Sequence, residues 1–277
     1  MGNLQADTAV KADGPGRYIA ELSADWEIWG PNGGYLAGIL LRAAAAESSQ
    51  PRPTSMSCHF LSVAEFGPVQ LDVTPLRSAK RAESLRVTMS QHDTTVVEAI
   101  VWMTTPGDGL SHDAGPAPDV EDPEGLPTLA ERLGPERPRP PFRFWDNLEW
   151  RPADWLGGPT DFEDHGPQVR NWFRYQPQAT FDDPVVDAIR SLILLDTMSW
   201  PSAHRAYPPG DLGFIAPTLD VNVQFHRAAP QSEWLLVQGK APVAEQGLIG
   251  FSSQVWSADR ALLASASGQM MCRPTTR

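Results

Sequence analysis

The sequence predicts an α+β protein in which one plan, a buried helix followed by a meander of antiparallel strands, is used twice. An apolar helical segment at residues 35–46 is followed by alternating segments up to residue 104, and a second apolar helix at 185–200 is followed by alternating segments from 218 to 272. A helix that is apolar on every side must be wrapped by other structure. We therefore expect two antiparallel sheets, each wrapped around a buried helix and together forming one continuous sheet.

The first use of this plan occupies residues 1–105. The alternating segment Arg17–Leu22 leads into a turn, and Asn32, a typical N-cap residue, begins the helix with Gly33 and Gly34. Alternation of apolar and polar residues then predicts strands at 55–63, 67–77, 83–92 and 95–104, with one face buried. His92-Asp93-Thr94 suits the hairpin turn between the last two strands.

Residues 106–167 differ from both halves in composition. Twelve of the 27 prolines lie there, together with acidic residues and few periodic segments. This composition is typical of a linker. The linker also carries several large aromatic side chains, among them Phe142, Phe144, Trp145, Trp150 and Trp155. A merely flexible segment would not need them, so we expect the linker to be packed on the surface of the protein.

Residues 168–277 repeat the order of the first half. Val169–Tyr175 alternates like the lead-in strand, and Asp182-Asp183-Pro184 is a typical start for the second helix. Alternation predicts strands at 218–227, 234–244, 246–256 and 262–272. The two halves therefore meet at a seam, where pockets tend to form.

Composition excludes several classes of function. The balance of 22 Lys and Arg against 34 Asp and Glu, a formal charge of −12, argues against nucleic acid as a partner. No apolar run approaches the roughly 20 residues of a membrane span, and the polar N-terminus lacks the apolar core of a secretory signal. Cys58 and Cys272 are expected to be free thiols in a reducing cytoplasm, and no ligand cluster around them suggests zinc.

Asp196 is the strongest candidate for chemistry. It follows three apolar residues at the end of the second buried helix, where a carboxylate is costly unless it is paired or hydrogen-bonded. Thr218 opens the next strand and Gln269 lies late in the last strand, so both can present polar groups to that helix end. Together the three side chains can hold one water molecule, with Asp196 as general base. The alternative is a helix-terminal Asp that simply reaches solvent.

The start of the first helix is a second candidate. The first amides of a helix lack internal partners and carry positive partial charge. At Gly33 and Gly34 a carbonyl can approach closely, so these amides are suited to stabilise the oxyanion that forms when a carbonyl group is attacked. The alternative is that the glycines only allow tight packing of the helix.

Several segments, taken in order, carry a resemblance to a known family. They are Gly30-Pro31-Asn32-Gly33-Gly34-Tyr35-Leu36, Leu195-Asp196-Thr197, the segment 218–227 with its Phe225-His226-Arg227 ending, and Leu263-Ala264-Ser265 followed by Arg273. With these segments the chain resembles the double-hotdog acyl-CoA thioesterases, of the acyl-CoA thioesterase II and thioesterase-like type. The resemblance covers nearly the whole chain except the proline-rich linker.

The resemblance implies a double-hotdog fold and a water-activating trio of Asp196, Thr218 and a Gln from the last strand. Counting back from Arg273, the Gln position of the family falls on Gly268, and Gln269 lies one residue later. A shift of one residue turns a strand side chain to the opposite face, unless a bulge restores it.

The expected reaction is hydrolysis of a fatty or related acyl-CoA to free acid and CoA by direct attack of water, in lipid metabolism, with no metal and no cofactor beyond the CoA of the substrate. Aromatic side chains are candidates to line the acyl pocket: Trp29, Trp200 and Phe225. Basic side chains are candidates to bind the CoA phosphates: Arg77, Lys80, Arg81 and Arg205. Each set has a plain alternative, as core residues or as a solvated strand edge.

Other functions stay open at this point. The first is a double-hotdog protein that binds an acyl thioester or small lipid without turning it over. A hydratase or dehydratase would need an Asp–His pair, but His204 lies eight residues beyond Asp196 and past a proline. A serine hydrolase would use Ser199 or Ser202, yet no Gly-x-Ser-x-Gly frames either residue. In each case we expect sheet edges to pair between chains, giving a homodimer or a larger oligomer.

Overall fold

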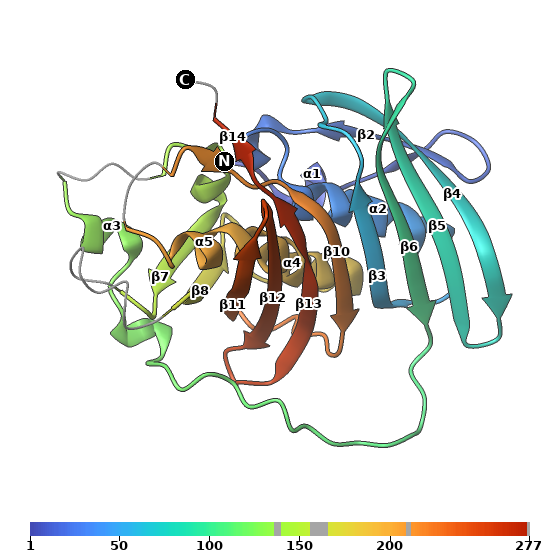
Figure 1. Ribbon diagram of the computed structural model, residues 1–277. Helices are drawn as coiled ribbons and strands as arrows, with labels where there is room; N and C mark the ends of the chain where they lie inside the picture. The colour runs from blue at the N-terminus through green and yellow to red at the C-terminus, as the bar shows by residue number, and fades with distance from the viewer. Residues whose placement is uncertain (136–139, 156–165, 209–211, 276–277) are drawn as a thin grey trace.

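One antiparallel sheet of twelve strands dominates the computed structural model, which describes residues 1–135, 140–155, 166–208 and 212–275 (Figure 1). In spatial order the strands are β1 (Lys11–Ala12), β2 (Arg17–Leu22), β4 (Gly67–Ala79), β5 (Ala82–Gln91), β6 (Thr94–Thr104), β3 (Arg52–Phe60), β10 (Thr218–Phe225), β13 (Leu262–Met271), β12 (Leu248–Ser257), β11 (Trp234–Glu245), β8 (Gln168–Tyr175) and β7 (Leu148–Pro152). The predicted α+β class, with one continuous sheet, is confirmed.

The strand order repeats itself about the centre of the sheet. β3 and β10 pair there in antiparallel register, from His59 opposite Asp220 to Ser55 opposite Gln224. Outward from this pair, each half continues with its last strand, then the two before it, then its lead-in strand. The sheet is therefore continuous across the seam.

Two long helices pack against each other on one face of this sheet (Figure 1). They are α2 (Gly33–Glu47) and α4 (Pro184–Thr197), and they run antiparallel, since the start of α2 hydrogen-bonds to the end of α4. The shorter elements are α1 (Leu4–Asp7), η1 (Ala24–Trp26), η2 (Pro123–Gly125), α3 (Leu129–Leu133), η3 (Arg143–Asn147), α5 (Ser199–His204) and the strand pair β9 (Phe214–Ile215) and β14 (Arg273–Pro274). In the described part of the chain, no helix has both the length and the apolar character of a membrane span.

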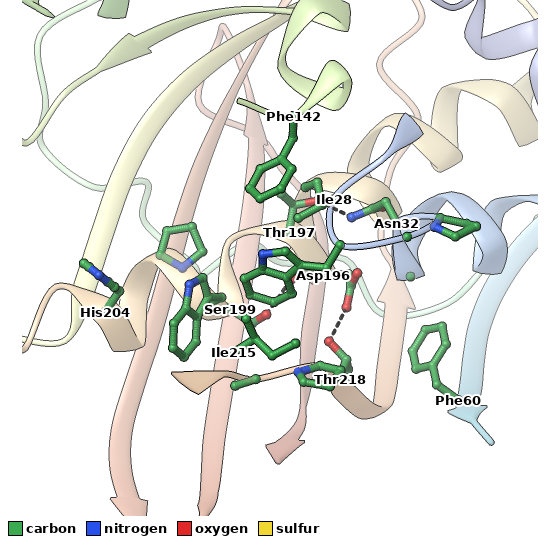
Figure 2. A pocket seen from close by; sticks show the side chains of 18 of the residues that line it. Ile28, Asn32, Phe60, Phe142, Asp196, Thr197, Ser199, His204, Ile215 and Thr218 are labelled. Carbon is green, nitrogen blue, oxygen red and sulfur yellow. Dashed lines mark hydrogen bonds between the residues drawn. The ribbon is translucent and has the colours of Figure 1, made fainter. Parts of the chain in front are cut away.

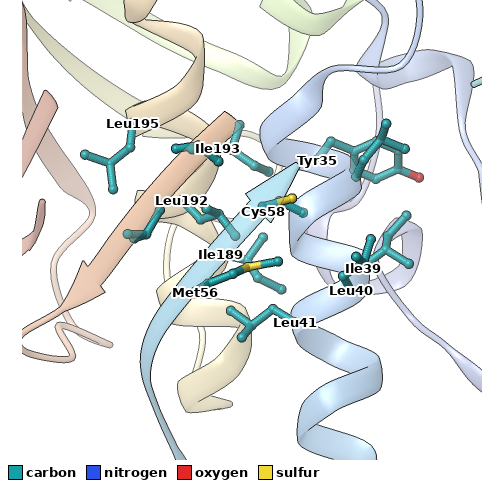
Figure 3. Close-up of a cluster of buried hydrophobic side chains, with 14 of the residues drawn as sticks. Tyr35, Ile39, Leu40, Leu41, Met56, Cys58, Ile189, Leu192, Ile193 and Leu195 are labelled. Atoms are coloured by element: carbon teal, nitrogen blue, oxygen red, sulfur yellow. The ribbon is translucent and has the colours of Figure 1, made fainter. Parts of the chain in front are cut away.

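The main core lies between the helix pair and the sheet (Figure 3). Ile39 of α2, Ile189 of α4 and Met56 of β3 are almost completely buried there, and each such side chain contributes about 1.5–3 kcal/mol. Cys58 is buried in the same cluster, where burial raises the pKa of its thiol. Cys272 is half-buried and, like Cys58, is a free cysteine.

The hairpin turn predicted after β5 is present. His92 and Asp93 have φ values of 50° and 60°, as the two central residues of a type I′ turn require. β5 ends at Gln91 and β6 begins at Thr94, so these two residues form the whole loop. Such a tight turn fixes the register of the two strands.

The linker contributes to the sheet, which the sequence did not predict. Its strand β7 pairs antiparallel with β8 and forms one edge of the sheet. Residues around Leu126 cover a small second core on the sheet face opposite the helices, built on Trp172, Leu236 and Trp256. The indole N–H of Trp172 donates to the Glu121 carbonyl at 3.0 Å. Residues 136–139 and 156–165 of the predicted linker, and 209–211 and 276–277 of the second half, lie outside the described residues.

Candidate active site

Asp196 lies in the last turn of α4, at the point where the two halves meet. Its side chain is 5% exposed. Its Oδ2 accepts a hydrogen bond from the Gly34 amide at 2.8 Å. Its Oδ1 accepts one from the Thr218 hydroxyl, also at 2.8 Å (Figure 2). The structure therefore brings Asp196 and Thr218 together, and the alternative of a carboxylate in bulk solvent does not hold.

The surroundings of Asp196 set its basicity. Burial raises the pKa of Asp196 above its ordinary value, and the hydrogen bonds from Thr218 and from the Gly34 amide lower it by less. A carboxylate with a raised pKa is a stronger base when it is ionised. Perturbed carboxylates of this kind cluster at functional sites.

The start of α2 is shaped to reach this carboxylate. Asn32 caps the helix, because its Oδ1 accepts from the Tyr35 amide at 2.9 Å, while its Nδ2 donates to the Thr197 hydroxyl at 3.2 Å. A Cβ atom at Gly33 would lie 2.9 Å from Asp196 Oδ2, so only glycine allows this approach. Of the two predicted oxyanion amides, that of Gly34 is already engaged by Asp196, and Gly33 lines the adjoining cavity.

A cavity of about 710 Å³ adjoins Asp196. Four segments that are distant in the sequence supply most of its lining: the loop before α2, residues 60–64 at the end of β3, the linker around residues 140–150, and the chain from α4 to the start of β10. Trp29 and Trp200, both predicted as pocket residues, are among its lining residues. Most of the other lining side chains are apolar, which suits a hydrocarbon ligand.

Trp29 is the centre of an aromatic group in this cavity. Its ring packs edge-to-face on Trp200, with centroids 5.8 Å apart, and on Phe142 of the linker, with centroids 6.4 Å apart. Its backbone has a φ of 58°, a left-handed conformation that is unusual for a bulky residue. Such strain persists only where the surrounding structure imposes it.

Gln269 does not join Asp196 and Thr218. It is exposed and lies on the outer face of β13, because its buried neighbours Ala266 and Met270 face the core. The inward position is taken by Gly268, where a Cβ atom would lie 2.1 Å from the Asp220 carbonyl oxygen. The register shift between β10 and β13 falls in β10, between Thr218 and Asp220, so no bulge in β13 turns Gln269 inward. The predicted trio is a pair in this structure.

Four other predicted ligand contacts also lie away from the cavity: Phe225, Arg77, Lys80 and Arg81. Phe225 ends β10, seven residues beyond Thr218, and is buried in the core. Arg77 and Arg81 flank the β4–β5 hairpin, next to the end of the sheet where Ala82, Thr104 and Arg52 pair side by side. The cavity lies at the other end of β3, at Phe60, about 26 Å away along the strand. The prediction that these side chains contact the ligand in the cavity is therefore wrong.

The basic side chains that do line the cavity are Arg205 and Arg273. Arg273 lies exposed in β14, and Arg205 donates to the Asp154 carbonyl at 3.0 Å. Sequence reasoning missed the linker wall, formed by Phe142, Trp145 and Trp150. The only sequence signal for this wall is the number of aromatic residues in a proline-rich segment.

The serines near Asp196 are engaged in the local helical turns. The Ser199 hydroxyl donates to the Asp196 carbonyl and the Ser202 hydroxyl to the Met198 carbonyl, each at 2.6 Å. Neither arrangement resembles a nucleophile held by a base. Within the four described ranges, no group of three or more His, Cys, Asp or Glu side chains is placed to hold a metal ion.

Comparison with known protein families gives two matches. Residues 22–104 match the family described as acyl-CoA thioesterase N-terminal domain, and residues 117–271 match the acyl-CoA thioesterase C-terminal domain. The two matches cover both halves of the chain in the expected order. No curated protein matches the chain.

Solved structures share the fold over the whole length. A conserved hot dog fold protein of unknown function from Alicyclobacillus acidocaldarius has a TM-score of 0.81 at 22% identity, covering 99% of this chain and 98% of its own. The acyl-CoA thioesterase II TesB2 of Mycobacterium marinum has a TM-score of 0.80 at 20% identity, covering 99% of each chain. A tesB protein of Mycobacterium avium subsp. paratuberculosis has a TM-score of 0.77 at 21% identity, covering 98% of each. The fold is therefore the double hotdog.

Proposed function

The chain belongs to the acyl-CoA thioesterase family, and from this premise we propose that it hydrolyses a fatty or related acyl-CoA to the free acid and CoA by direct attack of water. The observation that carries the proposal is the buried Asp196 carboxylate, held by the Gly34 amide and the Thr218 hydroxyl at the wall of an apolar cavity.

In the proposed reaction, Asp196 accepts a proton from a water molecule as the water oxygen attacks the thioester carbonyl carbon. The tetrahedral oxyanion then collapses, the C–S bond breaks, and Asp196 returns the proton to the CoA sulfur. The Thr218 hydroxyl donates to Asp196, so its oxygen remains free to accept a hydrogen bond from the water. General-base assistance of this kind contributes about 10²–10⁴-fold in rate.

The oxyanion is assigned to the start of α2. Gly33 is the first residue of the helix and lines the cavity, and first-turn amides carry the positive end of the helix dipole. Asn32 also lines the cavity, and its amide nitrogen carries one proton more than its bond to Thr197 uses. These two N–H groups take the place of the absent Gln as donors toward the reacting centre.

The residues that line the cavity suggest where the acyl group and the CoA phosphates of the substrate bind. The acyl group occupies the apolar space around Trp29 and Trp200, and the CoA phosphates contact Arg273 at its exposed rim. The reaction needs no metal and no cofactor other than the CoA of the substrate, and we place it in the cytoplasm.

A direct thiol-release assay over a panel of acyl-CoAs tests this proposal, with Asp196→Asn measured beside the wild type. The substitution keeps the shape of the side chain and removes the base, so kcat/KM should fall by about 10²–10⁴-fold. The melting temperature serves as the control for folding. Equal rates for the two proteins would remove Asp196 from the mechanism.

The second candidate is a protein that binds an acyl thioester or small lipid without hydrolysing it. The outward direction of Gln269 and the glycine at 268 favour it, because the polar group that the family places there is missing. Binding of acyl-CoA without thiol release from any substrate would support this candidate and end the hydrolase proposal.

For either function we propose a homodimer or larger oligomer formed through the sheet edges. At one edge β1 is only two residues long, and at the other edge β7 is five residues long, so strands of a second chain could extend either edge. Light scattering that detects only monomers would refute this proposal.

A further inference from the structure

We propose that the acyl group of the substrate carries an aromatic ring. The inference rests on the proposed function, since it names the substrate class of the same cavity. Its starting point is the distribution of aromatic residues. Seven of the 29 residues that line the cavity are Trp, Phe or Tyr, whereas these types make up 9% of the chain.

The ring geometry leaves aromatic faces for a ligand. The rings of Trp29 and Trp200 meet at 73°, and those of Trp29 and Phe142 at 89°. In an edge-to-face pair the edge of one ring meets one face of the other, so the pair leaves that ring's second face and both faces of the first ring unused, and a third ring can extend the arrangement. Each aromatic contact adds a factor of about 2 to 12 in affinity beyond the apolar area that it buries. A saturated chain gains only the area.

The aromatic wall is also held rigid. Around Trp29 the chain forms a tight loop, in which the Ile28 amide donates to the Gly30 carbonyl at 2.8 Å. The linker is tied to the same loop, because the Phe144 amide donates to the Glu27 carbonyl at 3.3 Å. Rigid walls suit a rigid ligand, since a ring has few torsions to lose on binding and a straight chain has many.

The linker supplies a second part of this wall. Trp145 and Trp150 both line the cavity and stack on each other, with centroids 4.8 Å apart and planes at 26°. Trp150 is anchored from outside the cavity, because its indole N–H donates to Asn171 at 2.9 Å. The polar end of the indole is thereby satisfied, and the ring itself remains for hydrophobic contact.

The test compares phenylacetyl-CoA with octanoyl-CoA, whose acyl groups have the same number of carbon atoms. For the wild type, kcat/KM should be about tenfold higher for phenylacetyl-CoA. In Trp29→Leu and Trp200→Leu the ratio of the two values should approach one, whatever the absolute rates. The control is Trp155→Leu, which removes an aromatic residue of the linker that does not line the cavity and should keep the wild-type ratio.

A binding measurement separates this inference from the proposed function. Dissociation constants of both thioesters for Asp196→Asn, measured by calorimetry, do not depend on turnover. Tighter binding of phenylacetyl-CoA by about tenfold supports the inference. Equal or tighter binding of octanoyl-CoA, or an equal kcat/KM in the wild type, overturns it and leaves the thioesterase proposal intact. Absence of thiol release from every substrate overturns the thioesterase proposal, and the binding constants still decide the ligand class.

Discussion

The two ends of the α2–α4 helix pair differ, although the same antiparallel packing produces both. At one end the start of α2 meets Asp196 in the last turn of α4, beside the cavity. At the other end the start of α4 meets α2, where Asp183 accepts from the Val185 amide at 2.8 Å and pairs with Arg42 at 2.5 Å. At each end, therefore, a carboxylate of α4 or its cap accepts a hydrogen bond from a backbone amide at a helix start.

The environments of these carboxylates are opposite. The Asp183 side chain is 38% exposed and its charge is balanced by a guanidinium. Asp196 is buried, and among the described residues its side-chain partners are an amide and a hydroxyl, neither of which carries charge. A carboxylate is available as a base only where no cation holds its charge. Neighbouring groups, and not the helix geometry, therefore decide at which end a carboxylate is available as a base.

Among substitutions that test the difference between the two helix ends, Gly34→Ala is expected to have the largest effect. A Cβ atom at Gly34 would lie 2.6 Å from the Ile193 Cα, so the helix ends must move apart. We expect kcat to fall by about 10- to 100-fold, because the Gly34 amide no longer fixes Asp196, and the free energy of unfolding to fall by about 1–3 kcal/mol. Thiol release and denaturant unfolding measure the two effects.

Gly38→Ala is the matched control one turn further along α2. Its Cβ atom would meet the Ile189 side chain at 2.8 Å, which can shift by rotation, and it lies away from the carboxylate. This variant should lose stability but keep the kcat of the folded protein. Equal losses of kcat in both variants would show that close approach at the Asp196 end has no special role.

A smaller effect is expected from Thr218→Val, which keeps the shape of the side chain and removes the hydroxyl. The Thr218 hydrogen bond lowers the pKa of Asp196, so its loss raises that pKa further. We expect kcat/KM to fall about tenfold and the acid limb of its pH profile to move to higher pH. In the wild type this limb should already lie above the range of an ordinary Asp, because burial raises the pKa. Coinciding limbs in the two proteins would contradict the assignment of Asp196 as base.

The smallest effect concerns stability alone. Because the pKa of Asp196 is raised in the folded state, its contribution to stability is fully present below its unfolded pKa, about 3.9, and is lost as the pH rises through the folded value. Asp196→Asn should therefore gain stability relative to the wild type between pH 4 and pH 8 in denaturant unfolding. A stability difference between Asp196→Asn and the wild type that does not change with pH would argue against the raised pKa.

Asp183→Asn is the matched substitution at the other helix end. It keeps the helix cap and should lower the free energy of unfolding by at most about 1 kcal/mol, with kcat unchanged.

The order of helices and strands could be predicted because it rests on local patterns. The alternating pattern predicted the end of β10 within two residues of its observed end at Phe225. The apolar pattern predicted α4, the long helix that precedes Thr218. The strand β7 was missed because it is five residues long, ends in Pro152 and lies in a proline-rich segment. Only its pairing with β8 makes it a strand, and that partner is distant in the sequence.

The site was predictable only where local position decides the direction of a side chain. Asp196 and Thr218 were found because one ends the buried helix and the other opens the next long strand, so in a sheet wrapped around that helix their side chains can meet. Gln269 was misplaced although the alternation of β13 already turns it outward. Arg77 was misplaced because its distance from the helix end depends on strand register across the sheet, which no local pattern encodes. The convergence of the linker aromatics on the cavity is equally non-local.

The difference between the helix ends bears on how the chain can change. Two identical units related by a twofold axis must present every residue twice, so a glycine start and an acidic end would both be required in the same helix. Joining the units in one chain removes that constraint. The glycine pair is needed only in α2 and the acid only in α4. The Arg42–Asp183 contact is then free to be purely structural, and the molecule has one buried carboxylate beside a cavity where a symmetric dimer would have two.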